Sequence, residues 1–209
     1  MRFNFPKKPD PITNEDEEKW NGYKAAVLSL ENEYSFKSSN NPNLNLFYLF
    51  NTKESAKILN TWQVFENEDY FKLIMLQYNS FIDAAGPTGG SRSYKSDGYL
   101  YGIISTKLNY GHVLIRPEKI LDKVIEIFNP VELDFPHHKK FSRQFFVLSD
   151  NQRFVLQNFN FEILEFLSSF KKLELEIVKN HCLFRLEKSI NKKEAHQLCK
   201  LGIGLSKLL

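Results

Sequence analysis

Residues 173–187, LELEIVKNHCLFRLE, contain the clearest strand pattern in the chain. In residues 173–178 leucine and isoleucine alternate with glutamate. Side chains of a β-strand point alternately to its two faces, so the pattern predicts one apolar buried face and one exposed acidic face. Residues 182–187 repeat the alternation, and the Asn-His dipeptide before them supplies a turn. The stretch therefore predicts an antiparallel hairpin.

The charged residues of this hairpin have two interpretations. Glu174 and Glu176 could act together as a general acid and a general base. Their spacing instead places both on one exposed strand face, opposite Arg185 on the second strand. Charge pairs across neighbouring strands are common, so we expect an ion pair here rather than a catalytic site.

Much of the chain before this hairpin is also predicted to form strands. Its short runs are rich in aromatic and β-branched residues and are separated by turn-forming residues. The predicted strands are residues 44–50, 55–65, 69–81, 99–108, 112–117, 131–135 and 141–149. The predicted loops or turns are residues 37–45, 66–69 and 84–98. Successive strands joined by short turns indicate an antiparallel meander.

Helices are predicted where apolar residues recur at three- and four-residue spacing. An acidic run at residues 15–18 suits the beginning of the first helix. Pro117 and Glu118 suit the first turn of another, and Asp150 suits a helix cap. The predicted helices are residues 14–30, 117–128, 151–158, 160–170 and 191–208.

Together these elements predict an α+β fold, mainly antiparallel sheet with segregated helices. Residues 1–12 hold three prolines and are expected to form an extended arm. Residues 13–110 are expected to form a first helix and a β-meander. Residues 111–209 are expected to form an α+β part that packs on the same core, so the arrangement admits two lobes that meet near residue 110.

Composition excludes several classes of protein. The 209 residues suit one large domain, and 42% hydrophobic with 25% charged residues is an ordinary globular balance. The 19 phenylalanines and 9 tyrosines provide apolar area for a core without a metal or a disulfide. A net charge of only +3 argues against a DNA-binding protein. We expect no cofactor.

Cysteine content and terminal composition indicate a cytoplasmic protein. Cys182 and Cys199 are the only cysteines, no CxxC motif occurs, and both are expected to be reduced core thiols. The N-terminal residues contain no apolar segment typical of a signal peptide. No run of about 18 apolar residues occurs, so no membrane span is expected.

Residues 134–145, DFPHHKKFSRQF, concentrate the groups that most resemble a catalytic site. Asp134, His137, His138 and Ser142 lie within nine positions and could form a hydrolytic Ser-His-Asp arrangement. The serine is not on a GxSxG elbow, and the histidines lack the HxxxH spacing of a zinc site. We expect no metal, and keep the hydrolase as an alternative.

The same segment also has a structural interpretation, as two strands joined by a proline-containing connection. Asp134 and Ser142 would then bind backbone groups at strand ends, because short polar side chains do this well. Arg116, at a strand-to-helix junction, is the favoured partner of Asp134. An anion bound by Arg116 is the weaker alternative.

RNA binding is a further alternative for this segment. A strand over residues 141–149 would place Phe141, Arg143 and Phe145 on one face, and Lys139–Phe145 would then stack bases between basic residues. The glycines of RNA-recognition motifs are missing, so RNA is disfavoured. Residues 86–92, GPTGGSR, lack the lysine of a phosphate-binding P-loop and are expected to be a hairpin tip.

Residues 114–148 resemble an uncharacterised bacterial domain family with the signature RPE…DF..H..FS..F.L. The matching residues are Arg116, Pro117, Glu118, Asp134, Phe135, His138, Phe141, Ser142, Phe145 and Leu148. A looser likeness covers about residues 20–209, and Gln77-Tyr78 stands where the family tends to have Asp-Tyr. The resemblance implies a recurrent domain without an assigned activity, in which Arg116, Asp134 and Ser142 form one structural unit.

These observations favour a soluble binding or adaptor module that is not an enzyme. It would bind a partner protein through exposed aromatic residues and sheet edges. The alternatives are a hydrolase that uses Asp134, His137, His138 and Ser142, and RNA binding through Lys139–Phe145. Self-association is left open.

Overall fold

The computed structural model describes residues 5–6, 14–51, 56–84, 91–118, 131–186 and 190–209. The strands are β1 (Ser35–Ser38), β2 (Ala56–Glu66), β3 (Asp69–Ala84), β4 (Ser91–Ser105), β5 (His112–Pro117), β6 (Val131–Glu132), β7 (Phe145–Ser149), β8 (Leu173–Val178) and β9 (His181–Leu186). The helices are α1 (Asn14–Leu28), the 3-10 helix η1 (Ser29–Asn32), α2 (Tyr48–Asn51), α3 (Lys139–Ser142), α4 (Gln152–Asn158), α5 (Phe161–Ser168) and α6 (Lys192–Leu208).

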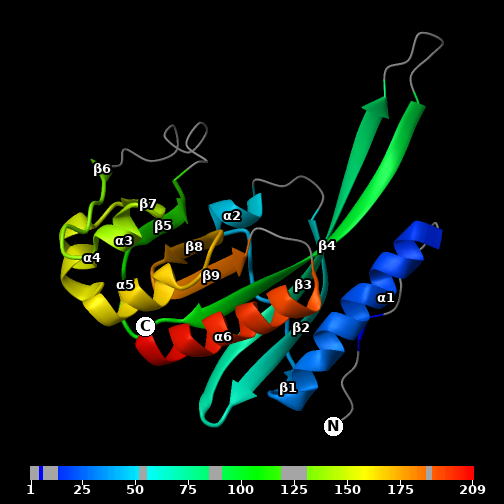
Figure 1. The fold of residues 1–209 in the computed structure, drawn as a ribbon, viewed down its shortest axis with the longest axis horizontal. Coiled ribbons are helices and arrows are strands. Elements are labelled where there is room, and N and C mark those ends of the chain that lie inside the picture. The colour runs from blue at the N-terminus through cyan, green and yellow to red at the C-terminus, as the bar shows by residue number, and fades with distance from the viewer. Residues whose placement is uncertain (1–4, 7–13, 52–55, 85–90, 119–130, 187–189) are drawn as a thin grey trace.

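The nine strands form one antiparallel sheet in the order β1-β2-β3-β4-β9-β8-β5-β7-β6 (Figure 1). This arrangement confirms the predicted α+β class. The hairpin β8–β9 lies in the middle of the sheet, with β9 beside β4 and β8 beside β5. Residues on both sides of position 110 therefore contribute strands to the same sheet.

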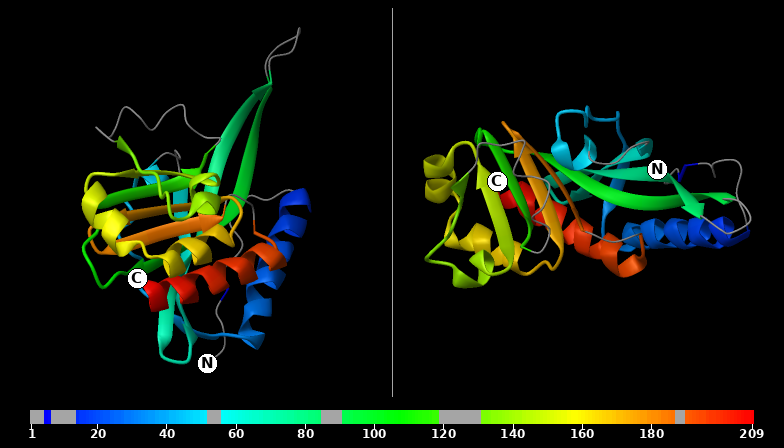
Figure 2. Two further views of the ribbon diagram at one scale, coloured as in Figure 1. Left: turned by 60° about the vertical axis from the view of Figure 1, so that its left-hand side comes forward. Right: turned by 90° about the horizontal axis from the view of Figure 1, so that it is seen from above.

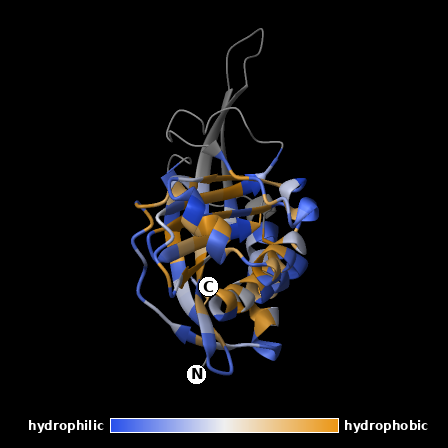
Figure 3. Cartoon of the chain, turned by 90° about the vertical axis from the view of Figure 1, so that its left-hand side faces the viewer, coloured by the Kyte–Doolittle hydropathy of each residue, from blue (hydrophilic) through white to orange (hydrophobic). Residues whose placement is uncertain are grey.

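The helices lie on different faces of the sheet. Helices α1 and α6 cover one face, whereas the short helix α2 lies on the other (Figure 2). Under α6 the largest core cluster contains fully buried aromatic residues such as Phe71 and Phe184. A second cluster, which includes Leu49 and Tyr101, lies under α2. Apolar residues accordingly occur both in the strands and in the helices that pack on them (Figure 3).

Strands β3 and β4 extend beyond the rest of the sheet as a two-stranded ribbon (Figure 1). Their pairing continues as far as Ala84 opposite Ser91. The predicted loop over residues 84–98 is therefore wrong for residues 91–98, which form the first half of β4, and for Ala84, which ends β3, while residues 85–90 lie outside the described part of the chain. The strand predicted at 69–81 and the turn at 66–69 are confirmed.

Two further predicted strands are helical in part. Residues 48–51, predicted as part of a strand, form α2. The strand that precedes β2 in the chain and pairs with it is β1, which begins before the predicted loop at 37–45. Residues 139–142 form α3, so the predicted strand 141–149 is shortened to β7. The cause is local: the Nδ1 atom of His138 accepts a hydrogen bond from the amide of Phe141, which caps α3.

Two predicted helix beginnings also differ. Pro117 is the last residue of β5 rather than the first of a helix, and the rest of the predicted helix 117–128 lies outside the described residues apart from Glu118. Asn151 rather than Asp150 occupies the cap position of α4, while the Asp150 carboxylate accepts the amide of His112 at 2.8 Å. The helices at 14–30, 160–170 and 191–208 are confirmed within a few residues. None of the described helices is both long enough and apolar enough to cross a membrane.

Two helical glycines allow a matched test of packing. A Cβ atom on Gly202 of α6 would lie 2.6 Å from the buried ring of Phe71, whereas one on Gly22 of α1 would meet nothing within 4 Å. We expect G202A to lower the free energy of unfolding by about 1–3 kcal/mol, because a closely packed core cannot absorb the methyl group.

The G22A variant is the control, and it should raise stability by about 0.5–1 kcal/mol through helix propensity alone. Urea denaturation of the three proteins measures both changes. Equal effects of the two substitutions would contradict the close packing of α6 on β3.

Candidate functional site

His138 and Ser142 of residues 134–145 are held in structural contacts. His138 is buried, its Nδ1 atom accepts the amide of Phe141, and its Nε2 atom lies 3.0 Å from the Glu165 carboxylate. Lys140 also bonds this carboxylate at 2.7 Å, and its hydrogen bond, with that of His138, lowers the pKa of Glu165. Both ring nitrogens of His138 are thus occupied, so the histidine cannot serve as the base for Ser142 without losing a bond.

Ser142 binds the backbone of Phe135. Its Oγ atom accepts the Phe135 amide at 3.0 Å and lies 3.3 Å from the Phe135 carbonyl oxygen, to which it donates. This is the junction contact expected for a short polar side chain. Asp134 and His137 are exposed. The hydrolase alternative therefore lacks the serine–histidine hydrogen bond on which it depends.

The stacking surface proposed for RNA is also missing from this segment. Phe141 and Phe145 are 0% and 2% exposed, and their ring centroids lie 5.1 Å apart within the core. The RNA alternative fails for this reason, because a buried ring cannot stack on a base. The described residues include no group of three or more histidine, cysteine or acidic side chains placed to hold a metal ion.

Arg116 contacts Glu174, not the predicted partner Asp134. Its Nε and one terminal nitrogen donate to the same Glu174 oxygen at 3.1 and 2.9 Å. Arg185 binds the other Glu174 oxygen, so the predicted cross-strand pair between these two residues is confirmed. The structural unit implied for Arg116, Asp134 and Ser142 is not formed, because each has a different environment.

The charges around Glu174 are buried, contrary to the predicted exposed face. Glu174 is 1% exposed and Arg185 is 7% exposed. Arg185 also donates to the Tyr101 hydroxyl at 2.7 Å, and Tyr78 donates to the same oxygen at 2.9 Å. Burial raises the pKa of both tyrosines, so they remain neutral hydrogen-bonding groups. This network is a structural support for the sheet face, not an open site.

Glu176, the second predicted surface residue, is fully buried and holds α2 on the sheet. Its two carboxylate oxygens accept the amides of Tyr48 and Leu49 at 2.9 and 2.7 Å. His112 Nε2 lies 2.6 Å from one of these oxygens. Glu176 therefore accepts hydrogen bonds from the first amide groups of α2, which would otherwise be buried without a partner.

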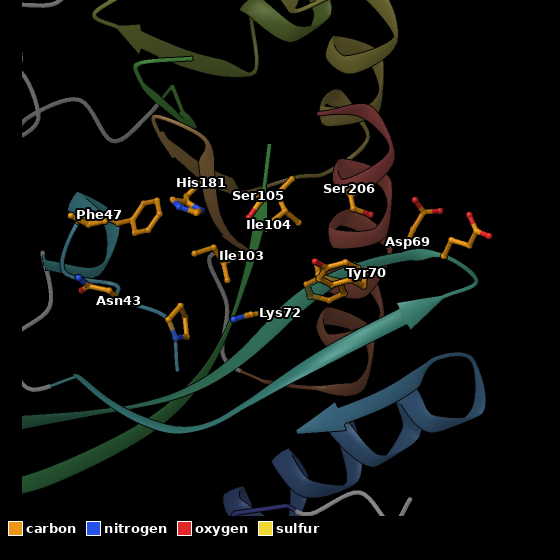
Figure 4. A pocket seen from close by; sticks show the side chains of 14 residues that line it. Asn43, Phe47, Asp69, Tyr70, Lys72, Ile103, Ile104, Ser105, His181 and Ser206 are labelled. Carbon is orange, nitrogen blue, oxygen red and sulfur yellow. The ribbon is translucent and has the colours of Figure 1, made fainter. Parts of the chain in front are cut away.

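Beside α2 the same sheet face carries a groove of about 430 Å³ (Figure 4). Its lining comes from the segment before α2, the neighbouring ends of β3 and β4, the beginning of β9 and the end of α6. We call it the β3–β4 groove, and the residues used below are Leu46, Phe47, Tyr70, Lys72, Ile103, Ser105 and His181.

Sequence patterns gave little sign of the β3–β4 groove. Its residues come from five distant parts of the chain, and no motif joins them. The available signal was the alternation within residues 69–76, which places Tyr70 and Lys72 on the same strand face as Ile74.

Comparison with known proteins supports the fold alone. No family model and no curated protein matches the chain. A crystal structure of the mycobacterial trehalose monomycolate transport factor A, TtfA, is similar, with a TM-score of 0.52 and 9% sequence identity. The similarity covers 90% of each chain.

The buried charge network predicts a large effect of one neutralising substitution. E174Q should lower the free energy of unfolding by about 3–5 kcal/mol, because the buried guanidinium group of Arg185 and the partly buried one of Arg116 would lose their counter-charge. Denaturant unfolding followed by circular dichroism measures the loss.

E165Q is the control, since the Glu165 side chain that pairs with His138 and Lys140 is 49% exposed and the loss of its charge should leave stability almost unchanged. If both substitutions had the same small effect, the Glu174 network would not support the sheet.

Proposed function

We propose that this chain is a non-enzymatic module that binds a partner protein in the β3–β4 groove. The observation that carries the proposal is the exposure of large apolar side chains at this groove. Of the groups that suggested catalysis in residues 134–145, His138 and Ser142 are bound to neighbouring parts of the fold, and Asp134 and His137 are exposed.

Two of the five large apolar residues that are exposed in the described chain lie at the rim of the groove. Leu46 is 57% exposed and Tyr70 is 49% exposed, although most large apolar residues of the described chain are buried. Phe47 and Ile103 continue the apolar surface inwards. Protein interfaces are enriched in aromatic residues and place apolar anchors in such hollows, so these side chains suit an apolar anchor of a partner.

The polar groups of the groove indicate what should lie beside that anchor. Lys72 of β3 is the cross-strand partner of Ile103 of β4 in the lining of the groove, and it forms no ion pair with a described residue (Figure 4). Ser105 and His181, which are paired across β4 and β9, add further hydrogen-bonding groups. A carboxylate on the partner next to its apolar anchor would neutralise Lys72. We therefore propose a peptide segment that carries an apolar residue and an acidic residue close together.

The proposal is tested by affinity capture from cells that express the protein naturally. Wild-type protein, the double variant L46S/Y70S and the variant K72E would serve as baits. We expect the wild type to retain one or more proteins, and the retained amount to fall at least about tenfold with the double variant. Truncating an interface anchor typically removes more than about 1 kcal/mol of binding free energy, and this variant truncates two. Mass spectrometry with quantification measures the retention.

The double variant L156S/F161S is the matched control. Leu156 and Phe161 are 46% and 66% exposed but lie on α4 and α5, away from the groove. This bait should retain the same proteins as the wild type. Equal retention by all baits, or specific recovery of RNA alone, would reject the groove as a protein-binding site.

A further inference from the structure

The outer edge of β2 is only partly covered by β1. Strand β1 pairs with β2 from Phe65 to Trp62, and the last contact is a hydrogen bond of 3.0 Å from the Ser39 amide to the Thr61 carbonyl. Strand β2 begins at Ala56, so residues Ala56–Leu59 continue beyond this contact. Among the described residues no strand lies on their outer side. We call Ala56–Leu59 the β2 edge.

The β2 edge is held in strand geometry from its inner side. Ala56, Lys57 and Ile58 pair with Tyr78, Gln77 and Leu76 of β3. Alternate residues of a strand direct their N–H and C=O groups to each neighbour, so this edge presents backbone donors and acceptors in position for another strand. Accepting a strand would therefore require no rearrangement of the sheet.

Half-buried apolar side chains flank the β2 edge on both faces. Ala56 and Ile58 pack against the cluster under α2, together with Tyr48 and Phe50. Leu59 lies at the register shift in β2 and packs against the larger core cluster instead. A strand added here with alternating apolar residues would extend the apolar contacts of the sheet.

The charge of Lys57 determines which added segment the β2 edge would favour. It is exposed and forms no ion pair with a described residue. An acidic side chain opposite it would gain a cross-strand charge pair, whereas a second copy joined edge to edge about a two-fold axis would bring two lysines together. A lysine and a bulge on an edge also guard against indiscriminate pairing.

We propose that the β2 edge accepts an extended segment of a partner protein, with alternating apolar and acidic side chains, as an additional strand. This inference rests on the proposed function in taking the partner to be a protein, but it uses different residues from the groove. Backbone hydrogen bonds supply the affinity, and Lys57 selects acidic over basic segments.

Two synthetic peptides provide the test: acetyl-Thr-Val-Glu-Val-Thr-Val-Glu-amide and the same sequence with lysine in place of glutamate. We expect the acidic peptide to bind the wild-type protein more tightly, and K57E to weaken this binding by about twofold to fivefold, in line with the strength of cross-strand charge pairs. K57E should also favour the basic peptide. Fluorescence anisotropy of labelled peptides measures both affinities.

The K200E variant is the charge-matched control, because Lys200 is exposed on α6. It should bind the acidic peptide as the wild type does. Hydrogen–deuterium exchange should show slower exchange at residues 56–59 when the acidic peptide is bound. Equal affinity for both peptides, no binding, or protection confined to another part of the sheet would overturn the proposal.

The outcomes separate this inference from the proposed function. The L46S/Y70S variant should still bind the acidic peptide, because the groove and the β2 edge are different sites. Peptide binding that is lost in this variant but kept in K57E would reject the edge and leave the groove. A concentration-dependent dimer in which residues 56–59 are protected without peptide would assign the edge to a second copy and overturn the proposal.

Discussion

The buried carboxylate of Glu174 is the interaction on which the sheet face under α2 depends. It lies in β8, next to the central strand of the sheet, and joins Arg116 of β5 to Arg185 of β9. Removing three charged groups from water is costly, and only near-complete pairing offsets that cost. The arrangement therefore fixes the register of three neighbouring strands more strictly than apolar packing alone. A shift of one residue would leave a charged group without its partner inside the fold.

Much of the architecture followed from local patterns. The hairpin β8–β9, the strands β2 and β3 and the helices α1, α5 and α6 all lie close to their predicted positions, since each combines a clear periodicity with a turn or a cap. The polarity of β8 was misjudged because strict alternation shows that the two faces differ, not that one faces water. Here a second layer, α2, covers the acidic face.

Elements that depend on distant residues were the ones that local patterns missed. Residues 44–50 contain an aromatic run that suits a strand or a short helix, and Glu176, more than a hundred residues later, stabilises the helix by accepting its first amides. The partner of Arg116 was missed for the same reason. The β3–β4 groove depends on how β3, β4, β9 and α6 meet, which no single segment encodes. Residues 134–145 did reveal Ser142 as a junction contact, while His138 proved to be both a helix cap and an ion-pair partner.

The place of β8–β9 in the sheet has a consequence for synthesis of the chain. Strands β4 and β5 leave the ribosome well before this hairpin, yet they become part of one sheet only through it, because β9 and β8 lie between them. Until residues 173–186 emerge, the nascent chain has two incomplete groups of strands, each with an open inner edge. Pairings of such high sequence separation form slowly, and open edges promote aggregation. Productive folding should therefore be completed late, when the hairpin closes the gap between the two groups.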